Sequence, residues 1–193
     1  FIEFLLSRNL TIFKLFYFLL ILTITIKFFS IFVKYIKIKK MSKYPRTYHL
    51  PKSPGATSDD KISNSISSIL GVEIVITEKL DGSNSAITKD GVYSRSHVDF
   101  SKNPWDKEIW NIYHRIDNDV DDGVYLFGEN MEGIHSIEYT DLKSYFYMFG
   151  IRDNNIWIPW EKVEEYSYLL DIPTVPVLFK GVINTEKELY DLI

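Results

Sequence analysis

The distribution of glycine and proline divides this chain at Met41. All 9 Gly and all 7 Pro lie in residues 41–193, and residues 1–40 contain neither. Because Gly and Pro supply the backbone conformations of most tight turns, only the second part can fold into a domain that reverses direction many times. We therefore expect two parts: a lead over 1–40 and a domain over 41–193, which is long enough to bury a core of its own.

The lead is apolar and basic. Its Lys and Arg residues outnumber its one acid by six, so the rest of the chain carries −10 within a total of −4. The longest uninterrupted apolar run, Leu15–Ile26, is shorter than the ~20 residues of a spanning helix, although lysines at both ends could extend a tilted span. Two interpretations stay open: a membrane anchor, or upstream A/T-rich DNA read in frame. We favour the second and expect the functional protein to start at Met41.

Composition excludes several kinds of chemistry. The chain has no Cys, which rules out disulfides, thiolate zinc sites and thiol catalysis. Its 4 His are scattered and form no metal-binding motif. The acidic balance of 41–193 also supplies no obvious basic stripe of the kind that nucleic-acid enzymes usually present.

Short apolar segments separated by turn residues follow one another through 41–193. Few helices intervene between them, which favours an antiparallel α+β domain over a doubly wound sheet. The expected strands are Val72–Thr77, Ser85–Thr88, Val92–Ser96, Gly123–Met131, Tyr145–Arg152, Ile156–Ile158 and Val175–Phe179. The expected helices are Asn103–Ile116, Trp160–Leu170 and a last helix that starts at a capping box of Thr185 and Glu188 and runs to Ile193.

The run Lys79-Leu-Asp81-Gly82-Ser-Asn84 follows the first expected strand directly. A lysine at the end of a rigid strand can be held beside a ligand, and it becomes a nucleophile when its pKa is lowered. The Asp-Gly turn lets the backbone approach a ligand, and an asparagine offers both a donor and an acceptor. The alternative is a polar surface turn, for which these residue types are also suited.

At these residues the sequence resembles the covalent nucleotidyltransferases, which are the ATP-dependent DNA and RNA ligases and the mRNA capping enzymes. Their motif is K-x-D-G-x-R or K-x-D-G-x-N. With Asn84 at the last position, this chain resembles the second form, which indicates the RNA ligase branch and particularly the RNA-repair ligases of the phage type-2 kind. The resemblance implies an antiparallel-sheet adenylation domain that uses ATP with Mg²⁺ or Mn²⁺. Lys79 would form lysyl-AMP, and the AMP would pass to an RNA 5′-phosphate before a 3′-hydroxyl displaces it.

Three further segments resemble later motifs of this family in the right order. Ser94-Arg95-Ser96 matches the next motif, Phe127–Met131 matches motif III, and Tyr147–Arg152 matches motif IIIa. Each segment taken alone is also compatible with an ordinary strand or core. The resemblance implies Lys79 as the catalytic residue and leaves the metal-binding residues unknown. It implies these ATP-binding residues: Glu78, Asp81, Asn84, Arg95, Glu129 and Phe149.

The pattern departs from the family after motif IIIa. Motif IV (E-G-x-V) and motif V do not follow the last expected strand, so we expect a partial, C-terminally incomplete domain. The leading hypothesis is an RNA ligase adenylyltransferase domain acting on RNA with 5′-phosphate and 3′-hydroxyl ends in the cytoplasm. Two alternatives stay open: an inactive remnant that binds nucleotide or RNA, or an interaction protein anchored to a membrane through 1–40.

Overall fold

The structure is a computed structural model of the chain. It describes residues 43–53, 56–95, 100–133 and 135–192, together with Thr25 and Lys27. The interpretations of the lead therefore lie outside the described residues, apart from those two positions. Ser96 of the second motif also lies outside them.

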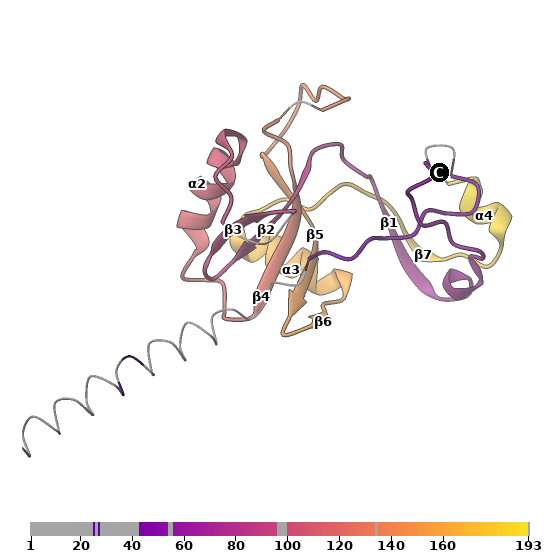
Figure 1. Ribbon diagram of the computed structural model, residues 1–193. Helices are drawn as coiled ribbons and strands as arrows, with labels where there is room; N and C mark the ends of the chain where they lie inside the picture. The colour runs from indigo at the N-terminus through magenta and orange to yellow at the C-terminus, as the bar shows by residue number, and fades with distance from the viewer. Residues whose placement is uncertain are drawn as a thin grey trace, which may run out of the picture. The chain divides into compact units, whose positions relative to one another are not determined.

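A five-stranded antiparallel sheet carries most of the candidate motifs (Figure 1). Its strand order is β3-β2-β4-β5-β6 and every pair is antiparallel. The pairs β2–β3, β4–β5 and β5–β6 are the hairpins that the pattern predicted, whereas β4 pairs with β2 and not with β3. The strands are β2 (Ser83–Thr88), β3 (Gly91–Ser94), β4 (Val124–Asn130), β5 (Phe146–Asp153) and β6 (Ile156–Trp157).

A second, two-stranded sheet pairs β1 (Glu73–Thr77) with β7 (Val177–Val182) in antiparallel register. The short helices η1 (Ser67–Ile69) and α4 (Glu186–Tyr190) lie next to this sheet, as Figure 1 shows. Buried side chains join these elements into a small core of their own: Ile66, Ile183 and Leu189.

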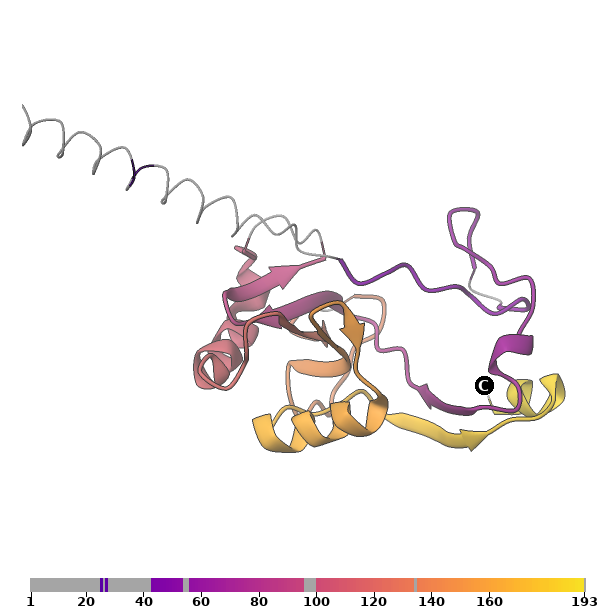
Figure 2. The same cartoon turned by 90° about the horizontal axis from the view of Figure 1, so that it is seen from below.

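Two helices cover one face of the five-stranded sheet. They are α2 (Lys107–Ile116), which continues from η2 (Pro104–Asp106), and α3 (Trp160–Leu170), which lies along β5 (Figure 2). Burial of apolar surface between helices and sheet is the main source of stability for such a layer. The fully buried side chains of this core include Ile87, Leu126, Met148 and Ile151 from the sheet, and Ile109 and Val163 from the helices.

The opposite face of the sheet carries a different row of side chains. Asn84 on β2, Glu129 on β4 and Tyr147 on β5 lie directly opposite one another in the strand register. Because residues paired across neighbouring strands point to the same face, these three side chains line one edge of that face. This second face also carries aromatic rings, among them the buried Phe127, and two of the expected ATP-binding residues, Asn84 and Glu129, lie on it.

The predicted antiparallel α+β fold is confirmed, and the differences lie at element ends. The last strand is 177–182, so it begins two residues and ends three residues later than expected. It begins later because the Val175 N–H donates to the Met148 carbonyl of β5, and Pro176 has no N–H to give to a ladder. The last helix ends at Tyr190. Thr185 caps it by accepting a hydrogen bond from the Glu188 N–H at 3.2 Å.

Candidate active site

Lys79 lies in the loop that connects the two sheets. β1 ends at Thr77 and β2 begins at Ser83, so the residues between them are paired in neither sheet. The side chain of Lys79 is exposed. Just before it, the Glu78 N–H donates a hydrogen bond of 2.8 Å to the carbonyl of Pro176. The Glu78 side chain is exposed, so its described contact is through the backbone.

Leu80 anchors the other side of the lysine. Its side chain is only 5 % exposed and packs with Met131, Tyr147 and Val175 in a small apolar cluster. Pulling such a side chain into water costs about 2 kcal/mol. The backbone on both sides of Lys79 is therefore held in place while the amine faces solvent.

Gly82 brings the turn into direct contact with β4. A Cβ atom at this position would lie 2.2 Å from the carbonyl oxygen of Asn130 and 2.9 Å from the sulfur of Met131. No side chain fits in that space. The glycine therefore allows the turn to approach β4, where its N–H donates to Oε1 of Glu129 at 3.2 Å.

Asp81 is held by the loop that joins β4 to β5. Its carboxylate accepts hydrogen bonds from the Ser136 N–H at 2.9 Å and from the Ser136 hydroxyl. Its own N–H donates to the hydroxyl oxygen of Tyr139 at 3.0 Å. The Ser136 hydroxyl, above all, holds the pKa of the Asp81 carboxyl below its ordinary value, because a hydrogen bond to the ionised form favours it. Asp81 is thus ionised at neutral pH.

Glu129 has the opposite electrostatic environment. Burial raises the pKa of its carboxyl, although the Gly82 N–H, Lys79 and His135 all pull the pKa down. Burial dominates because it removes the water that would solvate the charge. A half-buried carboxyl beside a lysine is suited to hydrogen bonding with the hydroxyl groups of a ligand.

Asn84 contains a buried oxygen that suits a ligand. Its Oδ1 atom is buried and has no hydrogen-bond partner among the described residues. An unsatisfied buried polar atom costs about 1–3 kcal/mol, so a donor supplied by a ligand would recover that energy. Asn84 is the direct strand neighbour of Glu129, which places the two side chains on one surface.

Phe149 lies at an irregularity in β5. The register between β4 and β5 shifts here, so that Phe127 pairs with Gly150 and Gly128 pairs with Met148, leaving Phe149 as an extra residue. Such bulges re-aim side chains and are common beside functional sites. Phe149 packs against the Leu80 cluster, which brings it near residues 78–82, the lysine loop. Its ring also lies edge-on to Tyr44, with centroids 4.9 Å apart.

Arg95 is not brought to this cluster by any described contact. It follows β3 and its side chain is exposed. Within the described part of the chain it makes no hydrogen bond or ion pair with residues 79–84, the motif turn. The structure therefore gathers Lys79, Asp81, Asn84, Glu129 and Phe149, while Arg95 stays a prediction.

The β4–β5 loop also contributes to the site, although no sequence motif marks it. His135 has its Nε2 atom 3.0 Å from the Ser83 hydroxyl, and Ser136 and Tyr139 contact Asp81 as described above. These residues follow no regular period and are more than fifty positions from the turn that they contact. Only the pairing of β2 with β4 reveals that they are neighbours.

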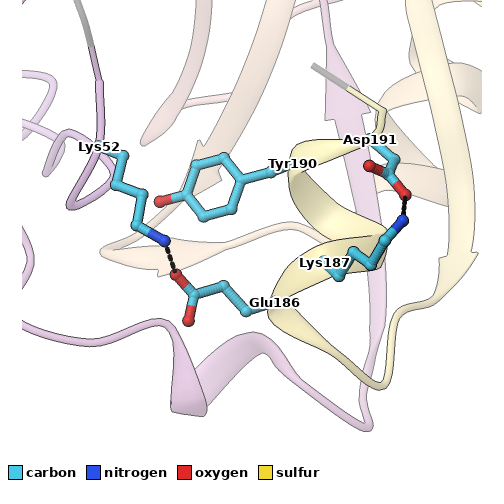
Figure 3. A pocket seen from close by; sticks show the side chains of 5 residues that line it. All are labelled: Lys52, Glu186, Lys187, Tyr190 and Asp191. Carbon is cyan, nitrogen blue, oxygen red and sulfur yellow. Dashed lines mark hydrogen bonds and ion pairs between the residues drawn. The ribbon is translucent and has the colours of Figure 1, made fainter.

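A surface hollow lies elsewhere in the described part of the chain. Figure 3 shows it beside α4, lined by Lys52, Glu186, Lys187, Tyr190 and Asp191, with a volume of about 550 Å³. Its charges are already paired, Lys52 with Glu186 at 2.8 Å and Lys187 with Asp191 at 2.5 Å. It shares no residue with the candidate site and offers no unbalanced charge to a ligand.

Two features are absent from the described residues. No group of three or more His, Cys, Asp or Glu side chains among them could hold a metal ion. Within the same residues, no helix is both long and apolar enough to cross a membrane.

Comparison with known families identifies the chain. The family model described as RNA ligase matches residues 72–192, which is more than half of the chain. The chain therefore belongs to the RNA ligase family, and the resemblance inferred from the motifs is confirmed. A comparison with curated proteins found no match.

Solved structures of Naegleria gruberi RNA ligase are also similar. A lysine-to-alanine mutant with ATP and Mn shares 22% identity at a TM-score of 0.44, covering 63% of this chain and 41% of that one. A glutamate-to-alanine mutant with AMP and Mn shares 23% identity, also at 0.44 and with the same coverage. An aspartate-to-alanine mutant without ligand shares 20% identity at 0.45, covering 63% and 40%. The chain thus spans about two fifths of the length of these ligases.

Proposed function

We propose that residues 41–193 form an adenylyltransferase domain of an ATP-dependent RNA ligase, with Lys79 as the nucleophile. The observation that carries this proposal is the anchored loop: an exposed lysine, flanked by a fixed backbone, acts electrostatically on the half-buried Glu129, whose strand neighbour is Asn84. Membership of the RNA ligase family supports the same role. The proposal leaves residues 1–40 as a lead outside the working domain.

The proposed chemistry is a phosphoryl transfer to nitrogen. The Lys79 Nζ, after losing a proton to solvent, attacks the α-phosphorus of ATP. The bond from that phosphorus to the bridging oxygen breaks, and pyrophosphate leaves with the electron pair. The product is a phosphoramide, lysyl-AMP, as expected for nucleophilic catalysis by an amine. A 5′-phosphate oxygen of RNA then takes the adenylyl group and restores the free lysine.

The surrounding residues fit the nucleotide. Asn84 and Glu129 offer an acceptor and a carboxyl on one surface, suited to the ribose hydroxyls. Phe149 offers an aromatic ring near the lysine loop, suited to stacking on the adenine. Glu78 and Arg95 stay as proposed contacts to the base and to the phosphates.

A divalent metal is part of the proposed reaction, because Mg²⁺ or Mn²⁺ neutralises charge on the phosphates of ATP. The Naegleria ligase structures contain Mn with ATP or AMP. The described residues contain no group of three or more metal-ligating side chains of their own. No step above is therefore assigned to metal-binding residues.

Incubation with ATP labelled at the α-phosphate, in the presence of Mg²⁺ or Mn²⁺, tests the proposal. We expect acid-labile label on the wild-type chain, no label on Lys79→Ala, and normal label on Lys102→Ala, a control at another exposed lysine. Label that survives Lys79→Ala would contradict the assignment. ATP binding without any label would favour the alternative of an inactive nucleotide-binding protein.

A further inference from the structure

Three residues of the loop between β4 and β5 contact the motif turn. Ser136 donates two hydrogen bonds to the Asp81 carboxylate, Tyr139 accepts one from the Asp81 N–H, and His135 contacts Ser83. We propose that Ser136 and Tyr139 are positioning residues, which hold Asp81 so that the lysine two positions earlier is presented to the nucleotide. This inference rests on the proposed function of Lys79.

The need for such positioning follows from the topology. The lysine loop leaves β1 in one sheet and enters β2 in the other, and after the Glu78 N–H bond to Pro176 neither ladder of strand hydrogen bonds extends over residues 79–82. A short unpaired segment retains conformational freedom, and misplacement of a nucleophile by about 1 Å can cost about a hundredfold in rate. Leu80 anchors the loop through its side chain, whereas the Asp81 contacts fix the backbone that follows.

The two residues are not needed for the main core. Ser136 is exposed, and Tyr139 packs only at the edge of the Leu80 cluster, away from the helix-covered face of the sheet. Removal of the tyrosine hydroxyl by Tyr139→Phe leaves its packing in place. Removal of the serine hydroxyl by Ser136→Ala leaves the 2.9 Å contact from its backbone N–H. Both substitutions therefore weaken positioning with little effect on folding.

The first test is a single-turnover measurement of lysyl-AMP formation in the full chain. We expect Ser136→Ala and Tyr139→Phe each to slow formation about tenfold, the effect of one lost hydrogen bond to a functional group. The ATP concentration for half-saturation should stay within about twofold of the wild-type value, because substrate binding is not the affected step. Ser136→Thr, which keeps the hydroxyl, should restore the rate.

Matched controls remove the same atoms at exposed positions. Ser68→Ala and Tyr168→Phe should adenylylate like the wild type. In an Asp81→Ala background, Ser136→Ala should cause no further loss, because the serine acts through that carboxylate. Rates for Ser136→Ala and Tyr139→Phe equal to those of the controls, or an undiminished effect in the Asp81→Ala background, would overturn the proposal.

Hydrogen–deuterium exchange gives a second measurement that does not depend on catalysis. The peptide containing residues 78–84 should exchange faster in both variants than in either control, while peptides from α2 and α3 stay unchanged. Unchanged exchange in the 78–84 peptide would overturn positioning even if the wild type forms lysyl-AMP. If no lysyl-AMP forms but exchange rises as expected, the assigned function of Lys79 fails and the positioning of its loop stands.

Discussion

Glu129 places a carboxylate where burial disfavours its charge, and this position costs stability at neutral pH. Because burial raises its pKa, the folded state binds its proton more tightly than the unfolded state does. Its contribution to folding therefore declines as the pH rises from the ordinary carboxyl value through the raised one. A site that retains such a group favours function over stability.

Glu129→Gln should consequently stabilise the fold. The amide oxygen can still accept from the Gly82 N–H, but no charge has to be buried. We expect Tm at pH 7 to rise by about 2–4 °C, the shift that about 1 kcal/mol produces in a domain of this size. The gain should vanish near pH 3, where the wild-type carboxyl is protonated. Exposed Glu138→Gln is the control, and a lower Tm for Glu129→Gln would contradict this account.

Asp81 should show the reverse pH dependence. Its pKa is lowered by the Ser136 contacts, so its contribution to stability is present above the ordinary carboxyl pKa and is lost as the pH falls through the lowered one. Asp81→Asn should therefore lower Tm at pH 7, and the difference from the wild type should shrink below about pH 4. Thermal melts across this range measure it; a difference that grows on acidification would refute it.

At the scale of elements, the close contact of the motif turn with β4 holds the turn beside Glu129. Gly82→Ala would place a methyl group against backbone that cannot move independently of the sheet. We expect a loss of about 2 kcal/mol in the free energy of unfolding, typical of overpacking. Gly133→Ala is the matched control, since its nearest neighbours would lie 3.9 Å away. Urea denaturation compares the two, and equal losses would show that the close approach is not what requires glycine.

The order and type of most elements could be predicted from the sequence. The alternating pattern of the strands and the Thr185 cap are local signals, and the structure has both at the expected positions. The bulge that displaces Phe149 could not be predicted, because it depends on how β4 and β5 pair. The contact of Ser136 with Asp81 was hidden for the same reason: two segments distant in sequence meet only once the sheet forms.

At the scale of the whole molecule, the net charge bears on RNA binding and not on the reaction with ATP. Residues 41–193 carry −10, so long-range attraction of RNA is not an evident property of this domain. We expect that adenylylation of the chain proceeds without RNA, and that a 5′-phosphorylated RNA strand binds weakly at low salt, with little further change up to physiological salt, because few basic side chains are available to displace counterions. Filter binding at several salt concentrations measures this, and tight binding at low salt that falls steeply as salt is added would contradict it.

The central claim is that Lys79 is the nucleophile, and one measurement tests it directly. The chain is incubated with ATP and Mg²⁺ or Mn²⁺, and the intact protein and its peptides are then analysed by mass spectrometry under conditions that preserve phosphoramide bonds. The account predicts a single adenylyl group, located on the peptide of residues 78–84 and assigned to Lys79. An adenylyl group on any other residue, or its persistence in Lys79→Ala, would contradict the account.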